Sequence, residues 1–166
     1  VNSVSFEGSS VVPPHPVEWT VSATPPTATT PDTECGNVPA GSPPAALYSG
    51  CGDDLDRSIV RSVSVPAGGG QLSFETLFDA EETWDFGFVQ VSDDGGKTWA
   101  SLSTVDTTTD HDPGAISGVT LQLPRFTGDG GSGKTETSDL SSYAGKNVLI
   151  GFRYITDSGV NEAGFW

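Results

Sequence analysis

Residues 92–99, Ser92-Asp93-Asp94-Gly95-Gly96-Lys97-Thr98-Trp99, carry the pattern that decides the fold. An alternating run, W-D-F-G-F-V-Q-V at positions 84–91, precedes this octet, and W-A-S-L at positions 99–102 ends it. This order predicts two antiparallel strands joined by an Asp-Gly-Gly turn. Gly95 and Gly96 can adopt the positive φ of a tight hairpin, and Asp94 can accept hydrogen bonds from the amides that follow it.

Similar short runs continue along the whole chain. We expect strands at residues 4–7, 18–23, 46–49, 58–65, 71–78, 85–92, 98–102, 119–123 and 148–156, and from residue 164 onward. The run 148–155 is apolar almost throughout, which is typical of a central strand covered on both faces. No window shows convincing helical periodicity. The pattern therefore predicts an all-β, two-sheet antiparallel β-sandwich with little or no helix.

The segments between these runs are expected to be loops. Residues 24–44 are rich in Thr and Pro, which predicts a long surface loop. Residues 106–114 and 127–138 are predicted to be polar loops. Residues 139–145 predict a single helical turn, with Ser138 or Asp139 as its cap and Gly145 as its stop.

Length and charge limit the classes of function. A chain of 166 residues with 12 Pro and 21 Gly predicts one domain, residues 1–166. The net charge of −15 argues against nucleic acid or an anionic membrane as a partner. No apolar run approaches the length of a membrane span. The charge favours a surface that attracts cations, the alternative being solubility alone.

Two cysteines, Cys35 and Cys51, flank a loop rich in Pro, Gly and Ala. Closing a loop of that length would stabilise the fold by about 3 kcal/mol, so we favour a disulfide. A disulfide indicates a secreted, extracellular protein. The chain has no initiator Met and ends at A-G-F-W, which reads as the opening of a strand. We interpret it as a segment of a larger secreted protein whose last strand is truncated.

Three motifs that resemble enzyme signatures are better explained without catalysis. Residues 128–135 match G-x-x-x-x-G-K-T, but the expected strand before and helix after a phosphate loop are missing. Residues 92–99 resemble the Asp-box of sialidases, yet only one copy is present, without an arginine cluster. His111, between Asp110 and Asp112, is read as a solvated loop histidine rather than a ligand.

Acidic residues gather at several predicted loops. Calcium binds six to eight oxygen atoms, commonly from turn carboxylates and backbone carbonyls, so such loops predict a structural calcium site. Glu81, Glu82 and Asp85 form an acidic group separate from the candidate calcium ligands. For all of these acidic residues, the alternative is a solvated acidic surface without a bound ion. The candidate calcium ligands are Glu7, Asp53, Asp54, Asp56 and Asp157.

Aromatic residues offer a different kind of site. Exposed rings could form a platform for sugars, although strand-borne Trp more often belongs to the core. The candidates are Trp19, Trp84, Trp99, Trp166, Tyr48 and Tyr143.

Several blocks of sequence resemble one known family. They are F-E-T-L-F-D-A-E-E-T-W-D-F-G-F-V-Q-V-S-D-D-G-G-K-T-W (74–99), D-L-S-S-Y-A-G-K-N-V-L-I-G-F-R-Y (139–154), T-D-S-G-V (156–160), G-F-W (164–166), S-F-E-G (5–8) and Y-S-G-C-G-D-D-L-D (48–56). These blocks resemble the MAM-like jelly-roll domain of the immune inhibitor A family of secreted bacterial metalloproteases. The loop between Cys35 and Cys51 has no counterpart that we can match to the family.

The resemblance implies a non-catalytic accessory domain. It would give substrate or surface contacts and stability to a zinc protease domain of the same parent chain, whose H-E-x-x-H motif lies outside this segment. A carbohydrate-binding module of an extracellular hydrolase is the alternative, with a protein or glycan ligand that the sequence does not identify. A sialidase-like Asp-box fragment is the weaker alternative.

Overall fold

The computed structural model describes residues 20–22, 46–115 and 122–165. Nearly all of their regular secondary structure is β-strand, and the only helical element among them is the 3-10 turn η1 (Ser141–Tyr143). The strands are β1 (Thr20–Ser22), β2 (Ala46–Tyr48), β3 (Asp56–Ser64), β4 (Gln71–Thr76), β5 (Phe78–Ala80), β6 (Phe86–Ser92), β7 (Ala100–Ser101), β8 (Gly128–Asp129), β9 (Lys134–Asp139), β10 (Asn147–Ile155) and β11 (Gly164–Phe165).

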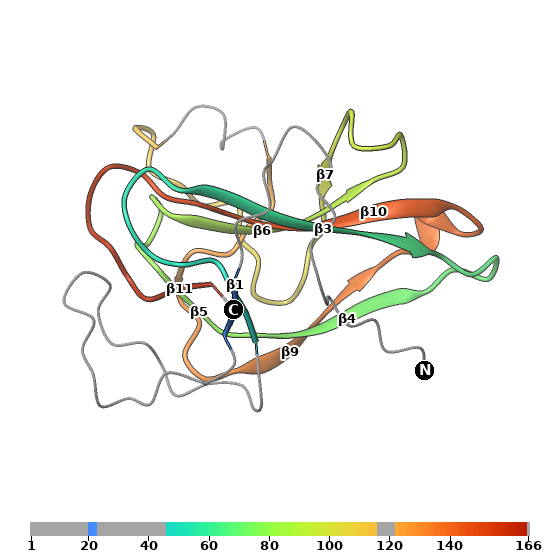
Figure 1. Cartoon of the computed structure of the whole chain (residues 1–166), viewed down its shortest axis with the longest axis horizontal. Helices are drawn as coiled ribbons and strands as arrows, with labels where there is room; N and C mark the ends of the chain where they lie inside the picture. The colour runs from blue at the N-terminus through green and yellow to red at the C-terminus, as the bar shows by residue number, and fades with distance from the viewer. Residues whose placement is uncertain (1–19, 23–45, 116–121, 166) are drawn as a thin grey trace.

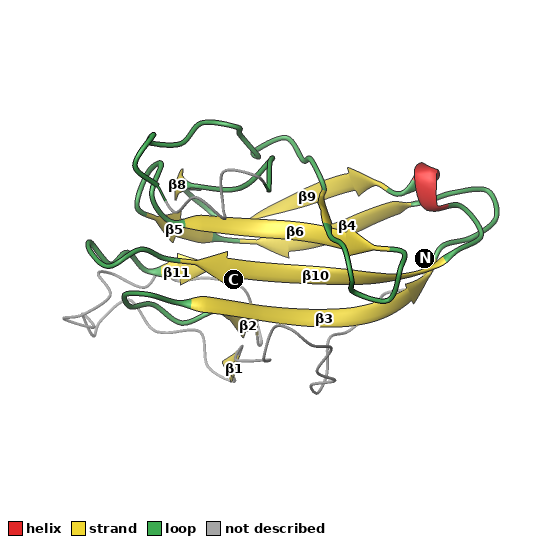
Figure 2. Cartoon of the chain, turned by 90° about the horizontal axis from the view of Figure 1, so that it is seen from above, coloured by secondary structure: helices red, strands yellow, loops and turns green. Residues whose placement is uncertain are grey.

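One layer is a four-stranded antiparallel sheet in the order β3-β10-β6-β7. Strand β10 lies between β3 and β6, as Figure 2 shows. The prediction of a central strand at 148–156 is therefore confirmed. Val148, Ile150, Phe152 and Tyr154 are buried on one face of β10, and Gly151 and Ile155 are buried on the other. A strand covered on both faces has no polar alternation, which explains its apolar sequence.

The other layer is built from shorter pieces: β11-β5-β8, β4-β9 and β1-β2. Strands β4 and β5 are separated only by Leu77. The amide of Ser49 donates to the carbonyl of Phe165 (2.9 Å), which joins the end of β2 to β11. The two layers lie face to face in Figure 1, so the predicted antiparallel β-sandwich of jelly-roll type is confirmed.

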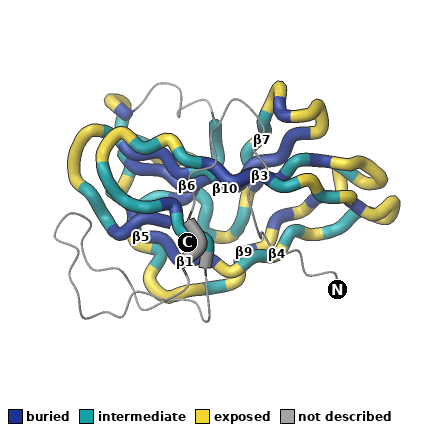
Figure 3. Tube along the Cα trace, in the orientation of Figure 1, coloured by how far each residue is buried: buried dark blue, intermediate teal, exposed yellow. Residues whose placement is uncertain are grey.

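The core between the layers is aromatic. The rings of Phe78 and Phe126 lie 5.1 Å apart, and those of Phe126 and Phe165 lie 5.5 Å apart. Phe165 packs so closely on β6 that a Cβ on Gly87 would lie 2.6 Å from its ring. Figure 3 shows the buried trace concentrated along the strands and the exposed trace in the connecting loops.

A second, smaller apolar cluster lies on the outer face of the four-stranded sheet. It contains Phe86, Phe88, Ala115 and Ile155, with Trp84 packed against them. The fully buried Arg125 covers this cluster, because its guanidinium lies 4.3 Å from the centre of the Phe86 ring. Arg125 also donates to the carbonyls of Thr109 (3.4 Å) and Asp110 (3.2 Å), which holds the loop at these residues against the sheet.

The octet 92–99 forms the predicted turn between β6 and β7. Asp94 accepts hydrogen bonds from the hydroxyls of Ser92 (2.8 Å) and Thr98 (2.7 Å) and from the amides of Lys97 and Thr98 (3.0 Å each). Gly95 and Gly96 have φ of 78° and 89°. Trp99 packs over the sheet, since a Cβ on Gly151 would lie 3.1 Å from its ring. The turn is thus a self-contained hydrogen-bonded unit.

The prediction that residues 127–138 form a loop is wrong for most of that range. Gly128–Asp129 is strand β8, and Lys134–Asp139 is strand β9, which pairs with β4 over six residues. The inward positions of β9 are occupied by Lys134, Glu136 and Ser138, whose polar groups contact the loop at residues 103–106. Because no apolar residue alternates along β9, the sequence does not reveal it.

Lys134 begins strand β9 instead of the helix that a phosphate loop requires. The reading of residues 128–135 as a chance match is therefore correct. The predicted helical turn at 139–145 is present as η1, and Gly145 follows it at φ 74°. The predicted cap at Ser138 or Asp139 is wrong, because the N-cap residue is Leu140 and has no side-chain cap hydrogen bond, while the Asp139 carboxylate accepts from the amide of Ser141 (2.9 Å). The expected strands at 4–7 and most of 119–123, and the loop at 24–44, lie outside the described residues.

We expect Asp94→Ala to lower the melting temperature. The hydrogen bonds from Thr98 and Ser92 hold the Asp94 pKa well below its ordinary value. The stabilisation is therefore present above pH 4 and is lost as the pH falls toward the lowered pKa. Thermal melts of the wild type and Asp94→Ala should differ at pH 7 and converge toward pH 2.

Asp93→Ala is the matched control, because Asp93 makes only an exposed ion pair with Lys146 (2.6 Å). An equal change in melting temperature for the two variants would contradict the role given to Asp94.

Candidate metal centre

The register of the central strands brings two distant acidic residues to one end of the sheet. Strands β6 and β10 run antiparallel, and Phe86 at the start of β6 pairs with Ile155 at the end of β10. Asp85 directly precedes β6, and Asp157 lies two residues after β10. Both must therefore emerge at the same edge.

A third carboxylate reaches this edge from the other layer. Glu81 directly follows β5, and the amides of Trp84 and Asp85 donate to its carbonyl (3.2 and 3.0 Å). This tight turn sets Glu81 beside Asp85. Carboxylate oxygens of Glu81, Asp85 and Asp157 all lie within 4.8 Å of one another. We call these three residues the acidic cluster.

Asp85 is the buried member of the acidic cluster, with only 1% of its surface exposed. Its Oδ1 accepts a hydrogen bond from the amide of Asp157 (3.0 Å). Its Oδ2 is buried and has no hydrogen-bond partner in the part of the chain that the structure describes. A buried charge with an unsatisfied oxygen is strongly unfavourable unless another group compensates it.

The electrostatics of the acidic cluster are uniformly negative. Burial, together with the nearby charges of Asp157 and Glu81, raises the pKa of Asp85 to about 7. Burial and the charges of Asp157 and Glu162 raise the pKa of Glu81. The ion pairs that link described residues, Lys134–Asp106, Lys146–Asp93 and Arg153–Asp56, do not involve the acidic cluster. Closely spaced carboxylate oxygens are the donors that a hard cation prefers, so the acidic cluster could hold a metal ion.

Comparison with known proteins places the chain. Residues 29–166 match the immune inhibitor A-like MAM domain. The chain belongs to this family. It is also 32% identical over 122 residues to the pre-pro-metalloprotease PrtV of two strains of Vibrio cholerae, M66-2 and El Tor Inaba N16961. The matched region is 73% of this chain but only 12% of the length of PrtV.

The expected resemblance is thus confirmed, and this segment is a MAM-like accessory domain rather than an enzyme. His111 in this MAM-like domain makes only a local contact, between its ring Nδ1 and the carbonyl of Thr109 (3.1 Å). Among the described residues, no helix is both long and apolar enough to cross a membrane.

The sequence-predicted metal ligands of the MAM-like domain are distributed over several places. Asp157 lies in the acidic cluster. Asp53 accepts a hydrogen bond from the side chain of Asn161 (2.8 Å), and Asp54 contributes its backbone amide to the carbonyl of Asp157 (2.6 Å). Glu7 lies outside the described residues. The structure brings Asp157 together with Glu81 and Asp85, which the sequence had placed in a separate acidic group.

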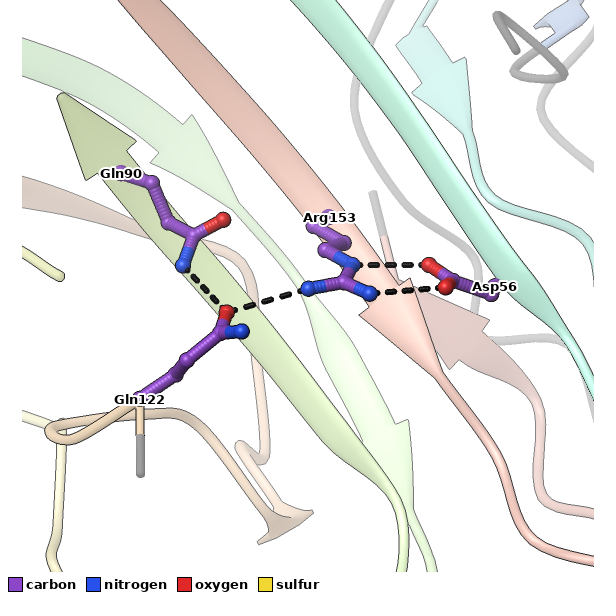
Figure 4. A network of polar contacts seen from close by, with 4 residues as sticks. All are labelled: Asp56, Gln90, Gln122 and Arg153. Atoms are coloured by element: carbon purple, nitrogen blue, oxygen red, sulfur yellow. Dashed lines mark hydrogen bonds and ion pairs between the residues drawn. The ribbon is translucent and has the colours of Figure 1, made fainter. Parts of the chain in front are cut away.

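Asp56 has a different partner. Both of its carboxylate oxygens accept hydrogen bonds from the Arg153 guanidinium (2.7 Å each), and Arg153 also donates to Gln122 (3.0 Å). Gln90 donates to the same Gln122 oxygen (2.8 Å), as Figure 4 shows. The charge of Asp56 is therefore compensated within the protein.

Cys51 lies in the described part of the MAM-like domain, between β2 and β3, whereas Cys35 lies outside it. None of the described residues is a free cysteine. The Cys35–Cys51 disulfide stays a prediction.

We expect Asp85→Asn to stabilise the domain when a chelator has removed divalent cations. The substitution removes the buried charge and retains an oxygen for the Asp157 amide. A pKa raised from 3.8 to about 7 corresponds to at most about 4 kcal/mol of unfavourable charge at pH 8. The wild type loses this stability as the pH rises from about 4 through 7, so the gain in the variant should be largest at pH 8 and vanish near pH 4.

Chemical denaturation in chelator at pH 4, 6 and 8 measures this gain. Asp53→Asn, a change in an exposed carboxylate, is the matched control. A lower stability of Asp85→Asn than of the wild type at pH 8 would contradict the assignment of Asp85 as an uncompensated buried charge.

Proposed function

We propose that this domain is a non-catalytic accessory module of a secreted metalloprotease, which gives the protease substrate or surface contacts and adds stability. The observation that carries this proposal is the match to the immune inhibitor A-like MAM domain over residues 29–166, joined to similarity with one part of a pre-pro-metalloprotease. The chain spans only 12% of that relative, which leaves room for a separate protease domain in a parent chain.

The same parent would be extracellular, with residues 1–166 forming one sandwich domain within it. The predicted Cys35–Cys51 disulfide supports an oxidising compartment. The net charge of −15 supports a surface that contacts basic or cationic partners and disfavours nucleic acid and anionic membranes. The partners in this proposal are the protease domain of the same chain and a protein ligand.

The stabilising part of the role uses calcium. Oxygen-only ligands and a strongly negative loop edge suit this ion, and extracellular calcium sites operate at the high calcium concentrations outside cells. Closely spaced carboxylates in the described part of the domain support the binding of a cation. Bound calcium would then stabilise the fold by mass action, because the unfolded chain lacks the assembled site.

Deleting the domain from the parent protease should weaken the binding of large substrates and leave the cleavage of short peptides nearly unchanged. We expect kcat/KM for a short peptide to change less than twofold, because the domain takes no part in bond cleavage. For a folded protein or surface-bound substrate we expect a loss of at least tenfold, because binding contacts are removed.

Equal losses on both substrates would contradict the accessory role, and so would equal retention on both. Hydrolysis of a peptide or sialoside by the isolated chain would also overturn it. Tight glycan binding by the isolated chain, without an effect on protein substrates, would favour the carbohydrate-binding alternative.

Calcium should raise the melting temperature of the chain. At a free calcium concentration about 100 times Kd the stabilisation is about 2.7 kcal/mol, which corresponds to roughly 5–10 °C for a chain of this size. Differential scanning calorimetry with calcium and with chelator measures the difference. Identical melts, with magnesium as a comparison ion, would remove calcium from the proposed function.

A further inference from the structure

We propose that the calcium ion binds at the acidic cluster, with carboxylates of Glu81, Asp85 and Asp157 as its ligands, and that it ties the β5–β6 connection to the segment after β10. This inference rests on the calcium-dependent stability in the proposed function and assigns the site. The candidate turn at residues 53–56 is the competing location.

Within the described part of the chain, Asp85 is a buried carboxylate with one unsatisfied oxygen. A cluster of acidic residues at a surface needs no ion, because water compensates its charges. Asp85 differs, since it is 1% exposed and its Oδ2 has no hydrogen-bond partner among the described residues. That buried oxygen belongs to a carboxylate lying within 4.8 Å of those of Glu81 and Asp157. A cation between the three carboxylates would supply the missing partner.

The spacing of the carboxylate oxygens in the acidic cluster suits calcium. Calcium–oxygen distances of 2.3–2.6 Å place ligands on opposite sides of the ion about 4.6–5.2 Å apart, whereas the corresponding separation for magnesium is about 4.1 Å. The carboxylate oxygens of the acidic cluster lie within 4.8 Å of one another, so they are no farther apart than opposite ligands of one calcium ion, and a single ion can contact all three residues. Remaining coordination positions can be filled by water and backbone carbonyls.

The carboxylates of the competing turn at residues 53–56 are exposed or already have partners within the protein. Asp56 is occupied by a two-oxygen contact with Arg153. Asp53 accepts a hydrogen bond from Asn161, and Asp54 is exposed. None of these carboxylates needs an ion to satisfy a buried charge. The turn at 53–56 therefore has less to gain from calcium than the acidic cluster.

The position of the site gives the ion a mechanical role. Glu81 follows β5 in one layer, while Asp85 and Asp157 flank β6 and β10 in the other. Asp157 also starts the loop that leads to β11, and Glu162, near the end of that loop, adds negative charge beside Glu81 and Asp79. An ion at the acidic cluster would join the two layers. Its positive charge would also offset the repulsion between Glu162 and the carboxylates of Glu81 and Asp79.

The test measures calcium affinity by titration calorimetry on the whole chain. Asp85→Asn, Asp157→Asn and Glu81→Gln should each raise Kd at least tenfold. The matched controls Asp53→Asn, Asp54→Asn and Asp56→Asn remove the same charge nearby and should change Kd less than threefold. Asp54→Asn is the sharpest control, because its backbone bond to Asp157 is retained.

Terbium ions provide a second readout, because they replace calcium and emit when a nearby indole is excited. Trp84 adjoins Asp85, so sensitised emission should appear in the wild type and fall at least fivefold in Asp85→Asn. Thermal melts in chelator show whether Asp85→Asn is folded, which separates loss of the ligand from loss of the structure.

Calcium binding that survives in Asp85→Asn but is lost in Asp54→Asn would overturn the site while leaving calcium in the proposed function. No heat of calcium binding to the wild type would overturn both the site and the calcium-dependent stability. The accessory role is tested separately, by the deletion experiment on the parent protease.

Discussion

The antiparallel pairing of β10 with β6 is the constraint on which the rest of the structure depends. Its register, Phe152 opposite Val89 and Ile155 opposite Phe86, sends one face of both strands into the core and the other face toward the cluster under Arg125. The register also brings the start of β6 and the end of β10 to one edge. A shift by one residue would exchange the two faces and separate Asp85 from Asp157.

Two acidic residues near that edge differ in how far the protein compensates the charge of their carboxylates. Asp56 is half-exposed and bound by both arms of the Arg153 guanidinium, so its charge is balanced where it lies. Asp85 is fully buried, faces other carboxylates and lacks a cationic side chain among the described residues. The ion pair of Asp56 with Arg153 contributes modestly to the stability of the sheet. The buried carboxylate of Asp85 is stable only if another group supplies positive charge or a proton.

Predictions from the sequence succeed where the signal is local. The turn at Ser92–Trp99 depends on contacts among residues at most four positions apart, such as Asp94 with Thr98. The central position of β10 follows from its continuous apolar run. Strand β9 shows the opposite case: its inward side chains Lys134, Glu136 and Ser138 are polar because they meet a polar loop. No period in the sequence encodes a neighbour that lies 35 residues away.

The sequence by itself determined the β-sandwich class, the hairpin at Ser92–Trp99 and the family, since each depends on residue order over short windows. It also supplied every member of the acidic cluster, but in two unrelated groups. Only the tertiary structure decided which acidic residues meet. The physical reason is that the meeting of Asp85 with Asp157 depends on the pairing of strands about 70 residues apart, and the burial of Asp85 depends on both layers.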